Sequence, residues 1–224
     1  MLLHQVRRTS GIVALAAVLA LPLAACGGED DTSDAAGSDE TSAATDESSM
    51  SEDAMATEVF GDGCSQVPTA GEGSVGGMVD DPVATAAANN PLLTTLTTAI
   101  GSIDGLSDTL NSAEALTVFA PVNSAFEEIP PKDLQAMVED GQKNGEDSDL
   151  YGVLAHHVVG ENADATAVVG EHETLAGDTL TVEGDPETGM TVSDGTVTAK
   201  VLCGNVPTAN ATVYVIDSVL TGTG

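Results

Sequence analysis

The sequence predicts a mixed fold, mainly β with helices, in which a helical half precedes antiparallel strands packed as a β-sandwich or wedge. Two observations predict it. Between residues 92 and 156, apolar residues recur at helical spacing. From residue 179 onward, short β-branched runs alternate with turn residues, as antiparallel strands do.

The first predicted helices come from capping signals and apolar spacing. Asp81 followed by Pro82 is typical of an N-cap and a first helical position. The next helix is indicated by apolar residues on one face, namely Leu92, Leu93, Leu96, Ile100 and Ile103.

The middle of the domain is expected to join one strand to one short helix. An apolar strand over 116–120 stops at Pro121, which cannot donate to a sheet. We expect Asn123 to cap a brief helix that runs through Glu128 and ends at Pro130. Further along, Ser148 is expected to cap a helix that ends near the paired histidines 156–157.

The last third is expected to be β. Candidate strands cover 179–183, 190–193, 196–202 and 212–220. The turns are supplied by Gly177-Asp178, Gly184-Asp185 and Asp194-Gly195. Segment 212–216 is nearly all β-branched or aromatic, which indicates a central strand.

The amino terminus reads as an export signal over residues 1–25. Arginines are followed by a short apolar run over 11–23, too short to span a bilayer comfortably, and then by small residues. The residues at 23–26, Leu-Ala-Ala-Cys, resemble the bacterial lipobox, and this resemblance implies a lipid on Cys26 with cleavage just before it. The alternative is an ordinary signal peptide cut near Ala25.

The remaining cysteines suggest a cross-link. If Cys26 carries lipid, Cys64 and Cys203 are left, and an even pair in an exported protein indicates a disulfide. Two separate buried thiols are the alternative.

Charge and composition divide the mature chain. The formal net charge is −31, with 36 acidic residues against five basic ones, so a nucleic-acid partner is not expected. Residues 26–63 are acidic and polar and are expected to form a disordered tether. Residues 64–224 are expected to form one domain with its core over 83–220.

Three segments resemble the signatures of the fasciclin domain family, in the family's order: 117–126, 154–159 and 209–220. The resemblance implies a single fasciclin domain. It implies structural roles for Phe119, Pro121, Asn123, Phe126, His157, Tyr214 and Asp217. His157 would be buried and bonded to nearby backbone, and His156 stands where many members have tyrosine.

The chain also resembles the single-domain fasciclin antigens of mycobacteria, through residues 81–96 and the placing of Cys64 and Cys203. In those proteins the cysteine placing implies a bridge. The lipobox and tether favour the lipid-anchored type, and the resemblance implies an actinobacterial source.

No catalytic or metal constellation is complete. His156 and His157 would need a further ligand, and the zinc-protease-like start at His172 lacks its second histidine, because position 176 is alanine. The sequon that begins at Asn210 lies inside the last family signature. We therefore expect no enzyme activity, cofactor or metal.

These observations predict an exported, monomeric adhesion module. It would be held on the outer face of the cell membrane by the lipid on Cys26 and would bind an extracellular protein or matrix partner. The alternative is an envelope carrier, in which the apolar helix over 92–103 covers a pocket for a lipid or other small apolar ligand.

Overall fold

A computed structural model describes residues 59–222; Cys26, the predicted signal peptide and most of the predicted acidic tether lie outside these described residues. The helices are α2 (Val75–Met78), α3 (Val83–Asn89), α4 (Thr94–Gly101), α5 (Leu106–Ser112), α6 (Asn123–Glu127), α7 (Pro131–Asn144) and α8 (Asp149–His156). The strands are β1 (Leu116–Pro121), β2 (Val158–Val159), β3 (Gly170–Glu173), β4 (Thr179–Asp185), β5 (Gly189–Ser193), β6 (Thr198–Pro207) and β7 (Ala211–Ile216). Short 3-10 turns occupy Asp62–Gln66, Pro91–Leu93 and Gly145–Asp147.

The strands form one seven-stranded sheet in the order β2-β1-β7-β6-β5-β4-β3. All neighbours are antiparallel except β1 and β7, which run parallel with Phe119 opposite Tyr214. The two ends of the sheet meet where Val159 bridges Thr174 and the Leu175 N–H donates to the Val158 carbonyl at 2.8 Å. The expected sandwich or wedge is thus one sheet curled nearly into a barrel.

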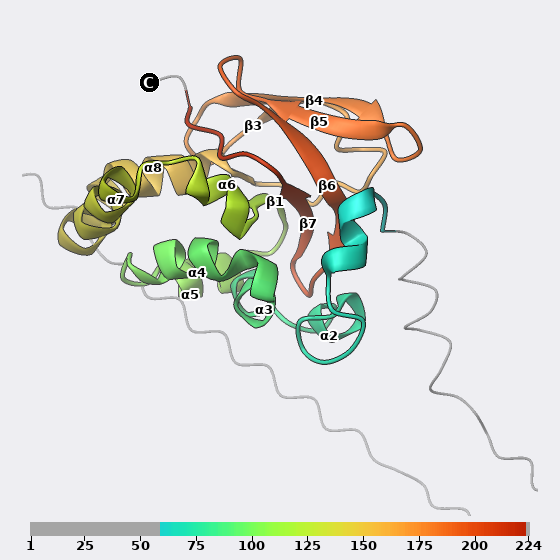
Figure 1. The fold of residues 1–224 in the computed structure, drawn as a ribbon, viewed down its shortest axis with the longest axis horizontal. Helices are drawn as coiled ribbons and strands as arrows, with labels where there is room; N and C mark the ends of the chain where they lie inside the picture. Colours follow the sequence, from blue (N-terminus) through green and yellow to red (C-terminus); the bar gives the residue numbers. More distant parts are fainter. Residues whose placement is uncertain (1–58, 223–224) are drawn as a thin grey trace, which may run out of the picture. The chain divides into compact units, whose positions relative to one another are not determined.

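Two apolar clusters hold the layers together. Figure 1 shows β3, β4 and β5 at one end of the domain, the helices at the other, and β6 and β7 running between them. One cluster packs helices on the sheet, through Leu93 and Leu96 among others, and the second fills the curl of the sheet around Leu180 and Met190. Every residue of β7 is buried, as expected of a central strand. Burying one such large side chain contributes about 2 kcal/mol.

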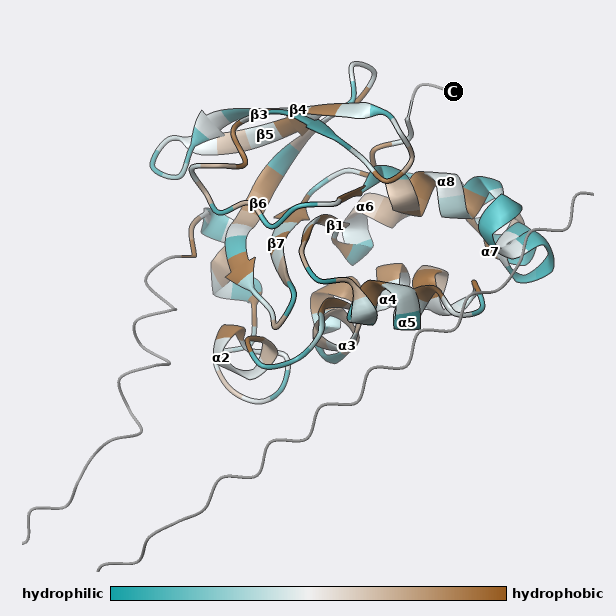
Figure 2. Ribbon diagram, turned by 180° about the vertical axis from the view of Figure 1, so that it is seen from behind, coloured by the Kyte–Doolittle hydropathy of each residue, from teal (hydrophilic) through white to brown (hydrophobic). Residues whose placement is uncertain are grey.

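Two helices depart from expectation. The predicted helix over 92–103 is divided into a 3-10 turn at Pro91–Leu93 and α4, with Ile103 buried after its end. We did not anticipate α7, whose residues are largely hydrophilic in Figure 2. Its one fully buried residue is Gly141, where an added Cβ would lie 2.9 Å from the Leu150 side chain.

The prediction that Asn123 caps its own helix was wrong. Asn123 begins α6, but its side chain caps α4 instead: Oδ1 accepts the Thr95 N–H at 2.9 Å and Nδ2 donates to the Pro91 carbonyl at 2.9 Å. The capping partner comes from an earlier part of the chain, so local spacing could not reveal it.

The start of α3 was also assigned wrongly. Pro82 occupies the N-cap, one residue before the helix, and makes no side-chain capping bond. The free amides are capped from elsewhere, because Asn210 Oδ1 accepts the Val83 N–H and Asn111 Oδ1 accepts the Ala84 N–H, both at 2.9 Å. Helix amides need such acceptors because no intrahelical carbonyl reaches them.

Asn210 therefore joins three elements. Its Oδ1 caps α3, and its Nδ2 donates to the carbonyls of Leu110 at 2.8 Å and Ala113 at 2.9 Å, at the end of α5. Both amide hydrogens are used inside the fold, which accounts for an asparagine at this position without any glycan.

Asn210→Ala is expected to lower the free energy of unfolding by about 2 kcal/mol, because it removes three partly buried hydrogen bonds. Denaturant unfolding of the purified protein measures the loss. Asn144→Ala, at an exposed position of α7, serves as the control and should change stability by less than about 0.5 kcal/mol. Equal effects of the two substitutions would contradict the bridging role.

The cysteines form the expected disulfide. Cys64 and Cys203 are bonded, with their Cα atoms 4.7 Å apart and a sequence separation of 139 residues. Beside the bridge, Phe60 pairs with Gly204 through two backbone hydrogen bonds of 2.8 and 3.2 Å. A side chain at Gly204 would collide with the Phe60 ring. The segment that enters the domain is thus fixed to β6.

Among residues 59–222, no helix combines the length and the apolar character that crossing a bilayer requires.

Candidate functional site

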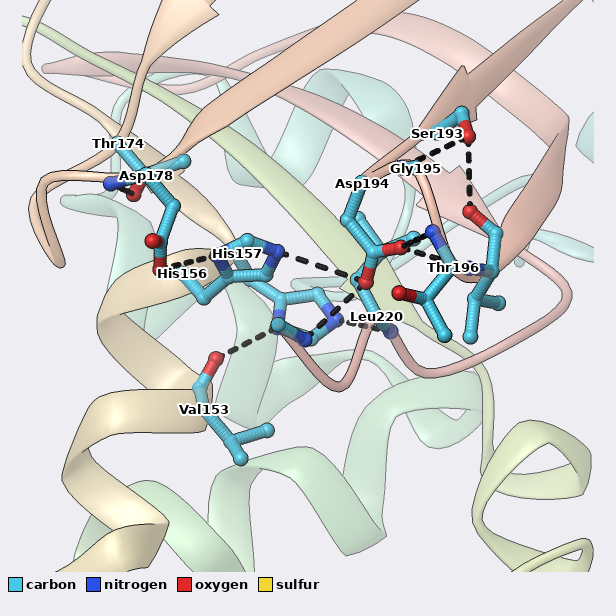
Figure 3. A network of polar contacts seen from close by, with 12 residues as sticks. Val153, His156, His157, Thr174, Asp178, Ser193, Asp194, Gly195, Thr196 and Leu220 are labelled. Atoms are coloured by element: carbon cyan, nitrogen blue, oxygen red, sulfur yellow. Dashed lines mark hydrogen bonds and ion pairs between the residues drawn. The ribbon is translucent and has the colours of Figure 1, made fainter. Parts of the chain in front are cut away.

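The most polar feature of the interior is a histidine network at the end of α8 (Figure 3). In it, His156 faces Asp178 in the β3–β4 turn and Asp194 in the β5–β6 turn, and the adjacent His157 contacts the Val153 carbonyl of α8. The carboxyl-terminal segment enters through the backbone of Leu220. Both histidines are almost fully buried.

The end of α8 places the histidines. Ser148 caps the helix as expected, accepting the Tyr151 N–H at 3.1 Å on its Oγ. His156 is the last helical residue and His157 is the C-cap. Because they are adjacent, their rings diverge, with an interplanar angle of 86°.

His157 is held as a neutral imidazole. Its Nδ1 lies 2.7 Å from the Val153 carbonyl and must donate, and its Nε2 accepts the Leu220 N–H at 3.0 Å. Burial lowers the pKa of His157 from 6.5 to about 4. The sequence-based expectation of a buried histidine bonded to nearby backbone describes this arrangement.

His156 lies between two carboxylates. Its Nδ1 is 3.1 Å from Asp178 Oδ2, and its Nε2 is 3.6 Å from Asp194 Oδ2, beyond hydrogen-bonding distance. A tyrosine here would present a single hydroxyl, whereas the imidazole has a nitrogen on each side and faces both turns.

Asp194 organises the turn before β6. Its carboxylate accepts the N–H groups of Thr196, Val197 and Gly222. Burial alone would raise the pKa of Asp194, but these donors hold it below its ordinary value. The carboxylate therefore remains charged and fixes both the turn and the carboxyl-terminal segment.

The network is built to brace the fold. Within residues 59–222, no serine, threonine or cysteine side chain donates to either buried histidine. A nucleophile within reach of its base is what covalent catalysis requires. The histidines instead contact Val153, Asp178, Asp194 and Leu220. These contacts fasten α8, two turns and the carboxyl-terminal segment to one another.

The third described histidine closes a separate contact. His172 Nδ1 lies 2.7 Å from Glu161 Oε1, and Nε2 lies 2.8 Å from the Val168 carbonyl. These contacts join β3 to the loop that precedes it. No group of three potential ligands that could hold a metal ion occurs among the described residues.

The other family-motif residues form the centre of the sheet. Phe119 and Tyr214 are neighbours on β1 and β7, with ring centroids 5.7 Å apart. The Tyr214 hydroxyl donates to the Ala163 carbonyl at 3.0 Å, and burial raises its pKa. Phe126 is buried on α6.

The two remaining motif residues lie at strand ends. Pro121 ends β1 opposite Ile216 of β7. Asp217 Oδ1 accepts the Lys200 N–H at 2.8 Å, just after β7. Both residues therefore have structural positions in the described fold.

The network partners Asp178 and Asp194 were recognised in the sequence only as turn residues. Each precedes or follows a glycine, which explains the turn but not the contact with His156. An unexpected histidine beside His157 was the only available signal, and it does not identify the carboxylates.

The pocket expected beneath the apolar helix is small. Between α3, α4 and the sheet lies a cavity of about 30 Å3, lined by Met78, Leu96 and Val213 among others. A second cavity of about 60 Å3 lies beside α5 and α8. Sites for drug-sized ligands measure about 300–1,000 Å3, so neither cavity accommodates a lipid as it stands.

Comparison with known proteins gives consistent results. The fasciclin domain family model matches residues 91–222. The chain is 44% identical over 173 residues to "Cell surface glycolipoprotein MPB83" of Mycobacterium bovis, covering 74% of this chain and 73% of that protein. It is 43% identical over 178 residues to "Immunogenic protein MPB70" of the same species, covering 76% and 86%.

A solved structure of a domain pair from the insect cell adhesion molecule Fasciclin I is 21% identical, with a TM-score of 0.46 over 57% of this chain and 44% of that chain.

Proposed function

The chain belongs to the fasciclin family, and on this premise we propose that it is a cell-surface lipoprotein that presents one fasciclin domain for adhesion to an extracellular protein or matrix. The observation that carries the proposal is the similarity to a relative named as a cell surface glycolipoprotein, which extends over about three quarters of both chains. The lipobox-like residues that end at Cys26 supply a means of anchoring.

The described domain supports a binding role in two ways. Its conspicuous buried polar groups are used to brace the fold, and the two cavities that α4 helps to line are too small for a lipid cargo. A disulfide suits an exported location, because thiols remain reduced in the cytosol.

Replacing Cys26 tests the anchor in the native host. The full-length protein should fractionate with membranes and carry a lipid-sized mass increment, whereas Cys26→Ala should appear in the culture medium or as unprocessed precursor. The control is Ser38→Ala, which changes a residue of the predicted tether and leaves Cys26 in place. It should leave fractionation unchanged. Membrane retention and processing of Cys26→Ala as in the wild type would contradict the lipoprotein assignment.

Adhesion is tested separately, by comparing a deletion strain with its complemented form for aggregation and for attachment to matrix-coated surfaces. Loss of either behaviour on deletion, with recovery on complementation, is expected. Unchanged behaviour in both assays would contradict the adhesive role.

A further inference from the structure

One end of the sheet has an edge that no other strand occupies. β3 pairs with β4 along its whole length, from Gly170 opposite Val182 to Glu173 opposite Thr179. Its other side has no strand partner over 170–173 within the described residues, because contact with β2 begins only at the Thr174 bridge. An exposed edge of this kind can pair with an added strand.

The backbone groups on this edge can be assigned from the pairing. The Thr174 N–H donates to the backbone carbonyl of Asp178, on the β4 side. The Leu175 N–H donates to the backbone carbonyl of Val158, on the β2 side. Backbone directions alternate along a strand. The amide and carbonyl groups of Glu171 and Glu173 therefore point to the open side.

The side chains along this edge follow the same alternation. Residues 169, 171, 173 and 175 are exposed, whereas those between them are partly or fully buried. We call Val169, Glu171, Glu173 and Leu175 the β3 stripe. Val169 and Leu175, 43% and 52% exposed, are the large hydrophobic residues that the described surface leaves exposed. They lie at opposite ends of the stripe.

The two glutamates between them have no basic partner in the fold. The acidic side chains that form ion pairs in the described residues are Glu139, Glu161, Asp178 and Asp194. His172, the residue between the glutamates, contacts Glu161 and the Val168 carbonyl instead. The stripe thus offers two uncompensated negative charges flanked by apolar side chains.

This chemistry selects the occupant. A second copy pairing through the same edge would bring glutamates against glutamates, and like charges opposite each other destabilise a strand pair. We propose that the open edge of β3 accepts an extended segment of a partner protein, with basic side chains opposite Glu171 and Glu173 and an apolar side chain opposite Val169. This inference rests on the proposed adhesive function and specifies the chemistry of its partner.

A short synthetic peptide tests the site. The probe is Lys-Thr-Lys-Thr-Val, which spans only the open part of the edge; it is capped at both ends, fluorescently labelled and added to the detergent-solubilised full-length protein. Fluorescence anisotropy should show saturable binding. Hydrogen exchange of the segment over 170–174 should slow in the bound state, because its open amides become paired. Absence of saturable binding would overturn the proposal.

Matched variants separate edge pairing from general charge attraction. Glu171→Lys with Glu173→Lys should weaken peptide binding by about tenfold or more, because two favourable cross-strand pairs become repulsive. Glu183→Lys with Glu187→Lys makes the same charge change at exposed positions of β4 and the following turn and should have a much smaller effect. Equal losses in the two variants would refute a site at β3.

The peptide supplies its own controls. Replacing its lysines with glutamates should abolish binding, and methylating the backbone nitrogens that face β3 should do the same, because the added strand then lacks donors. Binding that survives backbone methylation would show that no strand is added, and would overturn the proposal.

The attachment assay distinguishes this inference from the function on which it rests. If the Glu171→Lys, Glu173→Lys protein loses peptide binding but supports normal attachment, the β3 edge is not the adhesive site, although the domain still is adhesive. If deletion of the whole chain leaves attachment and aggregation unchanged, the adhesive function itself fails.

Discussion

Cys203→Ser is expected to lower the free energy of unfolding of the oxidised protein by about 5 kcal/mol, the largest single effect that we anticipate. The bridge closes a loop with a sequence separation of 139 residues. In the chain-entropy model, a cross-link stabilises a protein by restricting its unfolded state, and the effect grows with loop length. Native strain and residual unfolded structure reduce the effect in practice.

Thermal and denaturant unfolding measure this loss. Cys64→Ser and the double variant should match Cys203→Ser, because all three lack the same bond and its contribution is counted once. Wild-type protein treated with reductant should approach them. A Cys203→Ser protein as stable as the oxidised wild type would mean that the cross-link contributes no net stability.

A fall in pH from 7 to 4 is expected to remove about 3 kcal/mol of stability through His157 alone. Burial lowers the pKa of His157 to about 4 in the folded protein, against 6.5 for a free side chain. Between these values the unfolded chain binds a proton that the folded chain excludes. The contribution is therefore fully present above pH 6.5 and is lost as the pH falls toward 4.

The structure explains why protonation at His157 is unfavourable. Its Nε2 accepts the Leu220 N–H. A proton on Nε2 would make it a second donor facing that amide, and the hydrogen bond would be lost. The carboxylates of Asp164, Asp185 and Asp194 also have lowered pKa values, but they lose their contribution only below the ordinary aspartate value of 3.8. The effect of His157 falls between pH 4 and 6.5, above the range in which these three carboxylates act.

The comparison that checks this prediction is wild type against His157→Gln across the same pH range. The variant should be less stable at pH 7, because it loses the fitted ring, and its stability should change about 3 kcal/mol less between pH 7 and 4. Parallel pH profiles for the two proteins would contradict the assignment of the effect to His157.

The sequence anticipated the fold where local signals decide the structure. Pro121 ends a strand, Ser148 begins a helix, and the β-branched run over 212–216 becomes the buried β7. The family signatures also located Phe119, His157 and Tyr214, which occupy the centre of the sheet and the histidine network.

Other features depend on contacts between distant parts of the chain. Asn123 and Asn210 carry ordinary capping or sequon signals, yet each caps a helix from a different segment. Asp178 and Asp194 read as turn residues because nothing in their local sequence indicates His156. The open edge of β3 follows from the strand order, which spacing along the chain does not determine.

The position of the disulfide has a mechanical consequence. Phe60 and Cys64 are where the chain enters the domain from its amino-terminal side, and both are fixed to β6. Tension applied there while a partner grips β3 would divide between two covalent routes, one along the chain from Cys64 and one through Cys203. The longer of these two routes cannot extend fully while the shorter one is intact. The disulfide would therefore limit how far this part of the domain can extend under such a load.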